Sequence, residues 1–442
     1  MAFRRGISLA VKISSVLVAV AAALLTGVQG PAAEQPAKLS ANDVSILFPL
    51  PKADDDLSAF ISLADLTDAS GARLLSDEDF ARYVAVAEGP AGKVDGTPAR
   101  QIAFPTETKD LKAWFVAGIR IDVGAPGLSE DIMNEFGQIP QIRLIAQPVT
   151  GDAGHRLVHD RAAHFIFSFV ASVEPKQGCL PKFVPNLDAF RPALADFVAL
   201  RDGLANGRFG DVTVDTSGPL DVHPGLKGAS QKPFRDEIKA VLERHLKPAQ
   251  LSAMAAMGLP ASKLEPWIFV AMQKVPVGDG KFALISPPSP ALDGVLTAQL
   301  VKFGGKVAPK PMADNQNPIT RCLRPPAARK GVATADLDGL PTKGQVTDVT
   351  GIIADPAQSH FFNTDCVSCH TETRMLRAKV PSATIAGIAE AVLPKNAWNV
   401  RNFGWGSEGG ARFKPTITRR TATETAEVVK AANDLLPSLT IK

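Results

Sequence analysis

Short apolar runs, separated by polar residues, Gly and Pro, dominate the chain between about residues 38 and 311. Several of these runs are rich in β-branched and aromatic side chains, which favour strands. They are residues 44–50, 114–123, 141–149, 164–170, 267–275 and 282–286. We therefore predict a sheet in this part of the protein.

Alternation within one run indicates how the sheet is oriented. Ile119, Ile121 and Val123 alternate with Arg120 and Asp122. Because successive side chains of a strand point to opposite faces, one face of the sheet should be apolar and the other should face water.

Two segments in the middle of the chain have a different period. Residues 192–206 and 234–246 carry apolar side chains at helical spacing, and Pro or Gly marks their ends. Strands followed by helices and then by further strands predict an α+β domain with a mixed or antiparallel sheet. We assign residues 34–311 to this accessory domain, which is possibly divisible.

The first residues have the pattern of a secretory signal peptide. Arg4, Arg5 and Lys12 precede an apolar run at residues 16–25, and small residues follow up to about residue 33. The run is shorter than the roughly twenty apolar residues that a membrane span requires. We predict that residues 1–33 are removed, that the mature chain has no transmembrane span, and that it is periplasmic; an uncleaved anchor is the alternative.

Charge and length narrow the class of protein. The formal net charge of the 442 residues is +3, and the signal peptide supplies this excess, so the mature chain is near neutrality. Nothing in this balance indicates a nucleic-acid partner. The chain is long enough for two or three domains. Residues 312–347 are rich in Pro, Gly and Ala, and we predict that they link the accessory domain to a second domain at residues 348–442.

Two of the four cysteines lie close together in this second domain. Cys366 and Cys369 are followed directly by His370, giving the pattern Cys-x-x-Cys-His. Two thiols at this spacing can add to the vinyl groups along one edge of a porphyrin, and the next imidazole can then bind the iron. The pattern predicts one covalent haem c on Cys366 and Cys369, with His370 as metal ligand.

Three other interpretations compete with haem attachment. A thioredoxin-like pair should follow a strand near the start of its domain, whereas this pair lies deep in the C-terminal part. A structural zinc site needs four ligands, and no Cys or His follows His370. Chance is the third, and the scarcity of Cys and His argues against it. Export favours haem, because haem c is attached outside the cytoplasmic membrane of bacteria.

Residues 348–442 resemble a small monohaem c-type cytochrome domain, on the strength of Cys366, Cys369 and His370 and the order helix, haem, helix. The resemblance implies a mainly α fold. Thr421 and Glu424 match a capping box at the start of a closing helix, whose apolar residues recur until Pro437. The region before residue 348 takes no part in this resemblance.

The chain departs from class I cytochromes c in its second iron ligand. These proteins usually supply a Met well downstream of the attachment His, but here only Met375 follows His370. Five residues span at most about 17 Å, too little to reach the opposite face of the ring, so we interpret Met375 as a packing residue. His360 is the leading candidate for the distal ligand; an open site, or Met272 or Met312, is the alternative.

Residues 396–410 are aromatic and Gly-rich, as a loop covering a flat cofactor would be. Trp398, Phe403 and Trp405 are candidates for the wall of the haem pocket, and Arg401 or Arg412 for the partner of its propionates. The alternative is a small satellite core beneath a loop.

The remaining reactive residues give weaker signals. His155, His159 and His164 form the only histidine cluster, which we interpret as solvated or hydrogen-bonded residues near a strand rather than as a metal site. Cys179 and Cys322 are the remaining thiols, and in an oxidising compartment we expect them to form a disulfide.

We therefore expect an exported haem c protein that relays single electrons to or from an unidentified redox partner protein, and that is not itself an enzyme. The alternative is a haem enzyme or ligand sensor that acts on peroxide or nitric oxide at an open iron site. A structural or cell-surface protein with a sensing haem is a third class.

Overall fold

The computed structural model describes most of the chain from residue 38 onward. The described residues are 38–88, 93–94, 97–98, 102–124, 133, 137–174, 182–259, 267–277, 281–285, 299–301, 342–359, 366–396 and 398–436. All of them belong to one compact unit, Lys38–Lys442. The predicted signal peptide, most of the predicted linker, the proposed distal ligands His360 and Met312, and Cys179 and Cys322 lie outside the described residues.

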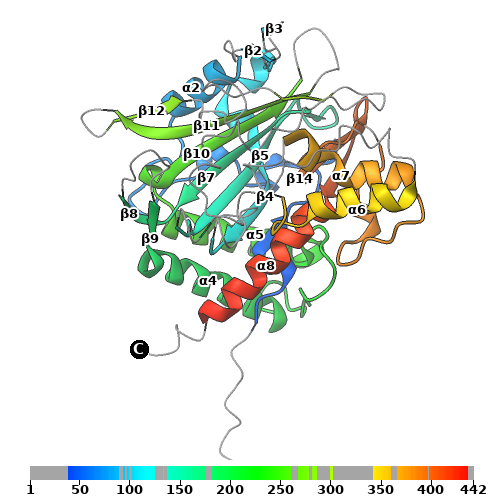
Figure 1. The fold of residues 1–442 in the computed structure, drawn as a ribbon. Coiled ribbons are helices and arrows are strands. Elements are labelled where there is room, and N and C mark those ends of the chain that lie inside the picture. Colours follow the sequence, from blue (N-terminus) through cyan, green and yellow to red (C-terminus); the bar gives the residue numbers. More distant parts are fainter. Residues whose placement is uncertain are drawn as a thin grey trace, which may run out of the picture. The chain divides into compact units, whose positions relative to one another are not determined.

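An antiparallel sheet forms the centre of this unit (Figure 1). Its strands run in the spatial order β1 (Ser45–Leu47), β4 (Trp114–Asp122), β5 (Gln141–Thr150), β7 (Ala162–Ser168), β10 (Leu251–Gly258), β11 (Trp267–Val277) and β12 (Lys281–Ile285). β6 (Leu157–Val158) pairs with β5, and β13 (Gln299–Val301) pairs with β11. All six strands that the sequence predicts are confirmed. β10 is not among them, since Ala and Met predominate there and lack the branched signature of a strand.

In the part of the chain that the structure describes, three short pairs of strands lie outside this sheet. They are β2 (Lys93–Val94) with β3 (Thr97–Pro98), β8 (Val170–Glu174) with β9 (Lys182–Pro185), and β14 (Phe403–Gly409) with β15 (Arg412–Ile417). The last pair is a hairpin in the segment for which the sequence predicts a loop. The loop prediction is therefore wrong for the second half of residues 396–410.

Helices flank the sheet, which confirms a mixed α+β fold. The α-helices of the described part are α1 (Ala41–Val44), α2 (Asp77–Glu88), α4 (Leu187–Ala205), α5 (Gln231–His245), α6 (Lys343–Ala354), α7 (Cys366–Lys379) and α8 (Arg419–Leu435). Of these, α4 and α5 confirm the two helices predicted in the middle of the chain. Within the described residues, no helix is both long and apolar enough to cross a membrane.

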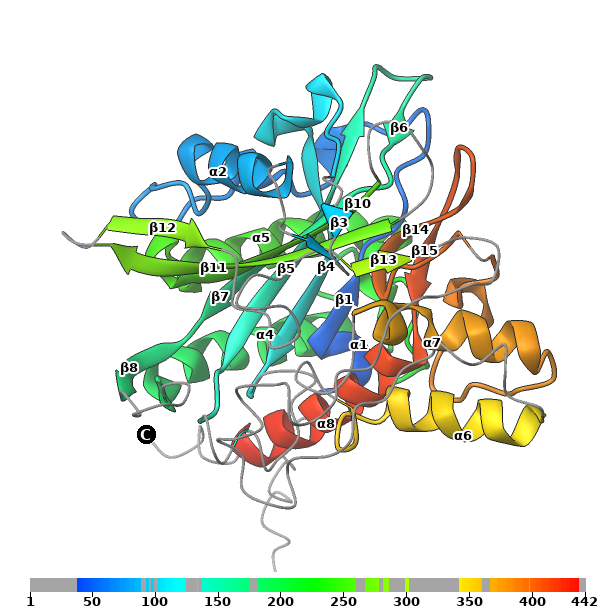
Figure 2. The ribbon, with the colours of Figure 1, turned by 45° about the horizontal axis from the view of Figure 1, so that its top comes forward.

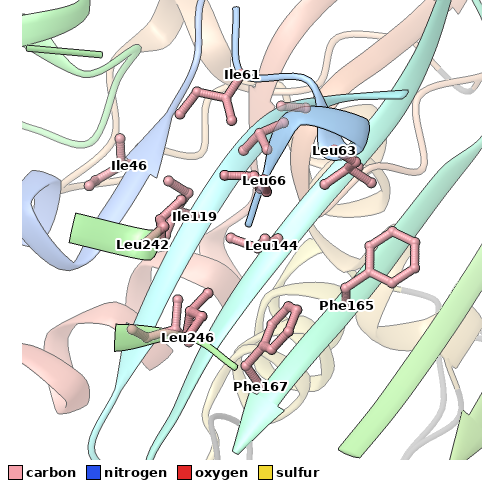
Figure 3. Packing of buried hydrophobic residues seen from close by; sticks show 14 of the residues in the cluster. Ile46, Ile61, Leu63, Leu66, Ile119, Leu144, Phe165, Phe167, Leu242 and Leu246 are labelled. Carbon is pink, nitrogen blue, oxygen red and sulfur yellow. The ribbon is translucent and has the colours of Figure 1, made fainter. Parts of the chain in front are cut away.

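One face of the sheet packs against α5 and a 3-10 turn at Leu63–Asp65 (Figure 3). Ile119, Leu144 and Phe165 point from this face, and each is at most 1% exposed. Leu242 and Leu246 pack against them from α5 and the residue that follows it. Burying each such side chain stabilises the fold by roughly 1.5 to 3 kcal/mol, so this face is the main core.

The opposite face of the sheet is polar, but along β4 it does not face water as predicted. Arg120 and Asp122 are only 6% and 4% exposed. Phe403, at the start of β14, lies over Gly118 on the same face of β4, and Glu424 of α8 bonds to Arg120. The C-terminal segment covers this part of the face, a contact between residues about 300 positions apart.

The region predicted as a separate C-terminal domain shares its cores with the accessory region. Trp405 and Val428 belong to the main hydrophobic cluster, and Phe403 packs with Leu47 and Ile145 in a second one. Figure 2 shows α6, α7 and α8 together beside the β1 side of the sheet. The first turns of α6 lie within residues 343–347, which the sequence assigns to the linker.

Candidate functional site

The Cys-x-x-Cys-His motif occupies the first turn of α7. Cys366, Cys369 and His370 are spaced as i, i+3 and i+4, so they lie on the same side of the helix. The side chain of Cys366 lies outside the described part, whereas Cys369 is half-buried and carries a thiol rather than a disulfide. The three residues of the motif thus belong to the start of one continuous helix.

The ring of His370 is held by a backbone carbonyl. Its Nδ1 lies 2.9 Å from the oxygen of Val400. A carbonyl oxygen can only accept, so Nδ1 carries the proton, and in the neutral ring the lone pair is on Nε2. Burial lowers the pKa of His370 to about 4, which keeps the ring neutral near pH 7. This is the tautomer that binds a metal through Nε2.

The carbonyl of Val400 is positioned by the hairpin that follows it. Trp405 N–H donates to Oε1 of Gln147 at 2.7 Å, and Nε2 of Gln147 donates to the carbonyl oxygen of Trp405 at 2.9 Å. The Gln147 side chain thereby imitates a neighbouring strand and fastens β14 to β5. The Trp405 indole donates to the Phe48 carbonyl oxygen at 3.1 Å, which fixes the hairpin further.

The backbone of the hairpin requires several of its glycines. A Cβ on Gly406 would lie 2.1 Å from Oδ1 of Asn399, a distance that no side chain tolerates. Gly409 and Gly410 have φ values of 103° and 61° at the turn, in the region that favours glycine. The Gly-rich composition of this segment therefore follows from the turn and from close packing.

A buried carboxylate joins α7 to the start of α8. Glu372 is 0% exposed, and its Oε1 accepts the N–H of Arg420 at 3.1 Å. Nη2 of Arg419 lies 3.2 Å from Oε2 of Glu372, an ion pair without hydrogen-bond alignment. A negative charge at a helix N-terminus is favourable because it meets the positive end of the helix dipole. The hydrogen bond and the ion pair of Glu372 therefore hold α7 and the start of α8 in a fixed position relative to each other.

The start of α8 corrects one prediction. Thr418 is the N-cap residue, and its Oγ1 accepts the N–H of Thr421. The helix begins at Arg419, so Thr421 and Glu424 lie inside it and the predicted capping box is wrong. Thr421 and Glu424 do match the capping-box pattern, but Thr418, three residues before Thr421, is also a suitable cap residue and forms the cap.

Glu424 instead joins two arginines in the interior. Its Oε2 accepts from Nη1 of Arg120 at 2.7 Å, and its Oε1 accepts from Nε of Arg420 at 2.6 Å. Burial raises the pKa of Glu424, but the two guanidinium groups outweigh it and hold the pKa at about 2. The carboxylate is therefore charged over the physiological range and locks α8 onto β4.

Arg420 also bonds to the end of α6 and to the segment that follows it. Its Nη1 donates to the carbonyl oxygens of Ile353 and Ser359 at 3.0 and 2.7 Å. Burial lowers the pKa of Arg420, but the negative charges of Glu424 and of a Cys369 thiolate outweigh this and raise it.

The aromatic residues proposed as a haem wall are part of the protein core. Trp405 is 0% exposed and meets the ring of Phe60 edge-on at 6.2 Å. Phe403 belongs to the second hydrophobic cluster, and Trp398 lies against Gly409. Trp405 thus packs in the main core and Phe403 in the second cluster, and their role as a haem wall stays a prediction.

The arginines proposed for the propionates have protein partners. Nη2 of Arg401 lies 2.9 Å from Oδ1 of Asp160, and the Arg401 side chain is 1% exposed. Arg412 is exposed and its guanidinium reaches backbone carbonyls of Glu408 and Gly409. Asp160 was not a sequence candidate; burial raises its pKa to about 6 against the opposing charge of Arg401.

The three clustered histidines do not converge on one point. His155 is exposed in a loop, whereas His159 is buried with Nε2 2.7 Å from Oγ1 of Thr150. His164 lies in the middle of β7, on the polar face of the sheet. Burial lowers the pKa of His164 well below 6.5, and the positive charges of Arg143, His370, Arg401 and Arg120 add to this. Sequence analysis missed Arg143, for which only the alternation along β5 gives a signal.

Possible metal ligands are few in the described part of the chain. No group of three or more His, Cys, Asp or Glu side chains gathers there, which gives no support to the zinc interpretation. Met375 is 5% exposed and packs with Val346, which confirms it as a packing residue. A haem held by Cys366, Cys369 and His370 fits this donor set, because it needs only one protein nitrogen on the attachment side.

Comparison of the chain with protein-family models, with curated proteins and with solved structures finds no match.

Proposed function

We propose that this protein is an exported haem c protein that relays single electrons to or from a redox partner protein. The observation that carries the proposal is the Cys-x-x-Cys-His motif on the first turn of α7, with the Nδ1 proton of His370 bonded to Val400. Spacing and tautomer both suit covalent attachment and iron binding.

In this proposal Cys366 and Cys369 hold the porphyrin through thioether bonds and His370 binds the iron. The bound group supplies reversible one-electron chemistry. The chain supplies orientation and charge: Val400 aims the imidazole, and Arg420 lies beside Cys369. Residues 348–442, with α6, α7 and α8 in mutual contact, are the cytochrome c-like part, and the mature protein is periplasmic after loss of residues 1–33.

Maturation in a bacterial host that attaches haem c tests the proposal. We expect a pyridine haemochrome spectrum of haem c, and a mass equal to the processed polypeptide plus one haem, because thioether formation adds the ring without loss of atoms. Replacing Cys366 and Cys369 together by Ala should remove both signals, whereas Cys179→Ala should keep them. Colourless protein with the bare polypeptide mass would contradict the proposal.

Carbon monoxide separates electron relay from ligand chemistry. A six-coordinate carrier binds carbon monoxide slowly after reduction, because an internal ligand must first dissociate. We expect this slow reaction. Rapid binding would instead favour a haem enzyme or sensor that acts on peroxide or nitric oxide.

A further inference from the structure

The polar face of the sheet has a partly open patch in its middle. Arg143, His164, Ile166, Ala253 and Ala255 are neighbours on this face, as the pairings of β5, β7 and β10 show. All five are only half-buried. On the opposite face the residues between them, such as Leu144, Phe165 and Met254, are at most 1% exposed. The patch is thus less completely covered than the opposite face of the same three strands.

The C-terminal segment that orients His370 runs along the edge of this patch. Val400 accepts the bond from His370, and four residues later Gly404 lies against Ile145 and Gln147. Ile145 is the direct cross-strand neighbour of His164 on the same face. The His370 ring is close enough to His164 for its charge to act on that ring, together with those of Arg143, Arg401 and Arg120. The two histidines therefore lie near each other, His370 on α7 and His164 on β7.

The composition of the patch suits a haem. Ile166, Ala253 and Ala255 are apolar or small, as contact with a flat macrocycle requires. Arg143 is a guanidinium whose buried Nε has no hydrogen-bond partner among the described residues. The negative charges of Glu424 and Asp122 already act on Arg143, and a haem propionate would add an acceptor for its unbonded Nε. Arg401, the other buried arginine near these histidines, is already paired with Asp160.

We infer that His164 is the second axial ligand of the iron, so that the haem lies between α7 and the polar face of the sheet, with Arg143 beside a propionate. This inference rests on the proposed function and extends it. It assigns the larger region a role, since the accessory sheet then completes the haem site that the C-terminal segment begins. It also replaces His360 as the leading candidate.

The test uses the full mature protein carrying its haem. Wild-type protein should be low-spin in both oxidation states, with a ferric electron paramagnetic resonance spectrum of two imidazole ligands. His164→Ala should become high-spin, bind carbon monoxide rapidly when reduced, and return to low spin on addition of imidazole. His164→Met should stay six-coordinate with a higher midpoint potential, because a thioether favours the ferrous state.

Two matched variants exclude indirect effects. His159→Ala removes another buried histidine from the adjoining segment and should leave the low-spin spectrum unchanged. His360→Ala should also leave it unchanged. A low-spin spectrum of His164→Ala without added imidazole, or one that only His360→Ala abolishes, overturns the inference.

Two outcomes test the inference even if the His164 variants do not fold. A high-spin ferric spectrum of the wild-type protein overturns the inference, since no second imidazole is then bound. Loss of the low-spin spectrum in His360→Ala overturns it as well. Failure of the proposed function is distinguishable from both, because the wild-type protein would then be colourless.

Discussion

Replacing Glu424 by Gln tests how strongly the C-terminal helix is locked onto the sheet. The Glu424 side chain is 12% exposed, and its partners Arg120 and Arg420 are 7% and 4% exposed. Glutamine keeps the shape and one acceptor oxygen but removes the charge, which leaves two buried guanidinium groups without their anion. Breaking a buried ion pair in this way costs roughly 3 to 5 kcal/mol.

The pKa of Glu424 gives a second estimate of this loss of stability. The folded pKa of Glu424 is about 2, against an ordinary value of 4.5. A difference of roughly 2.5 units at about 1.4 kcal/mol each corresponds to about 3 kcal/mol of stability at neutral pH. The two estimates agree. Because the folded pKa is lowered, this stability is present above pH 4.5 and is lost as the pH falls towards 2.

Urea unfolding of the mature protein, followed by circular dichroism, measures the effect. At pH 7 Glu424→Gln should be about 3 kcal/mol less stable than wild type, and the difference should shrink progressively below pH 4.5. Asp77→Asn is the control: it breaks a pair with Arg73 at the surface, where Asp77 is 76% exposed, and water screens such pairs. A difference below about 1 kcal/mol, or one that does not change with pH, would refute the role given to Glu424.

Three further substitutions test other parts of the structure. Gln147→Ala leaves the backbone N–H and carbonyl of Trp405 without their buried partners, so unfolding in urea should show a loss of roughly 2 to 4 kcal/mol; an unchanged midpoint would mean that the hairpin is held by other contacts. Burial raises the pKa of Asp122 to about 7 from 3.8, so the stability of the fold should decline as the pH rises from about 4 to 7. Asp122→Asn should flatten that decline in a pH series of unfolding midpoints. An unaltered slope would contradict the burial of this carboxyl. If the haem site is as proposed, Arg143→Gln removes a cation near the iron and should lower the midpoint potential by roughly tens of millivolts, whereas Arg412→Gln at the exposed turn should not; equal potentials in both would place Arg143 away from the iron.

Most strands can be predicted from the sequence because their positions depend on local composition. Residues 114–123 and 141–149 are rich in branched and aromatic residues, and β4 and β5 form there. β10 was not recognised, because Met254 and Met257 lie three positions apart in an Ala-rich stretch, a spacing that suits a helix as well as a strand.

Long-range contacts were not readable in the same way. Alternation along β4 correctly separates Ile119 from Arg120, but it cannot say what lies on the polar side. Water and a helix 300 residues away are equally compatible with a polar face, and only the structure shows Glu424 there. Asp160 was unreadable for the same reason, since its partner Arg401 lies 241 residues further along the chain.

In the candidate site, too, the local features were predictable from the sequence and the long-range contacts were not. The motif at Cys366, Cys369 and His370 was evident, because its chemistry depends on spacing within five residues. The carbonyl of Val400 that orients His370, and the patch around His164, depend on how a hairpin docks on the sheet. Trp405 was assigned to the haem because aromatic residues in a Gly-rich segment do not reveal which core they join.

Oδ1 of Asn433 accepts the N–H of Leu39 at 2.8 Å, while its Nδ2 donates to the carbonyl oxygen of Leu39 at 3.0 Å. These bonds close a loop of 394 positions, so one edge of the fold cannot be completed until α8 has left the ribosome. A chain of such high contact order folds slowly. During that interval β1 and the charged side of β4 are uncovered, and chaperones or proteases would compete with α8 for them.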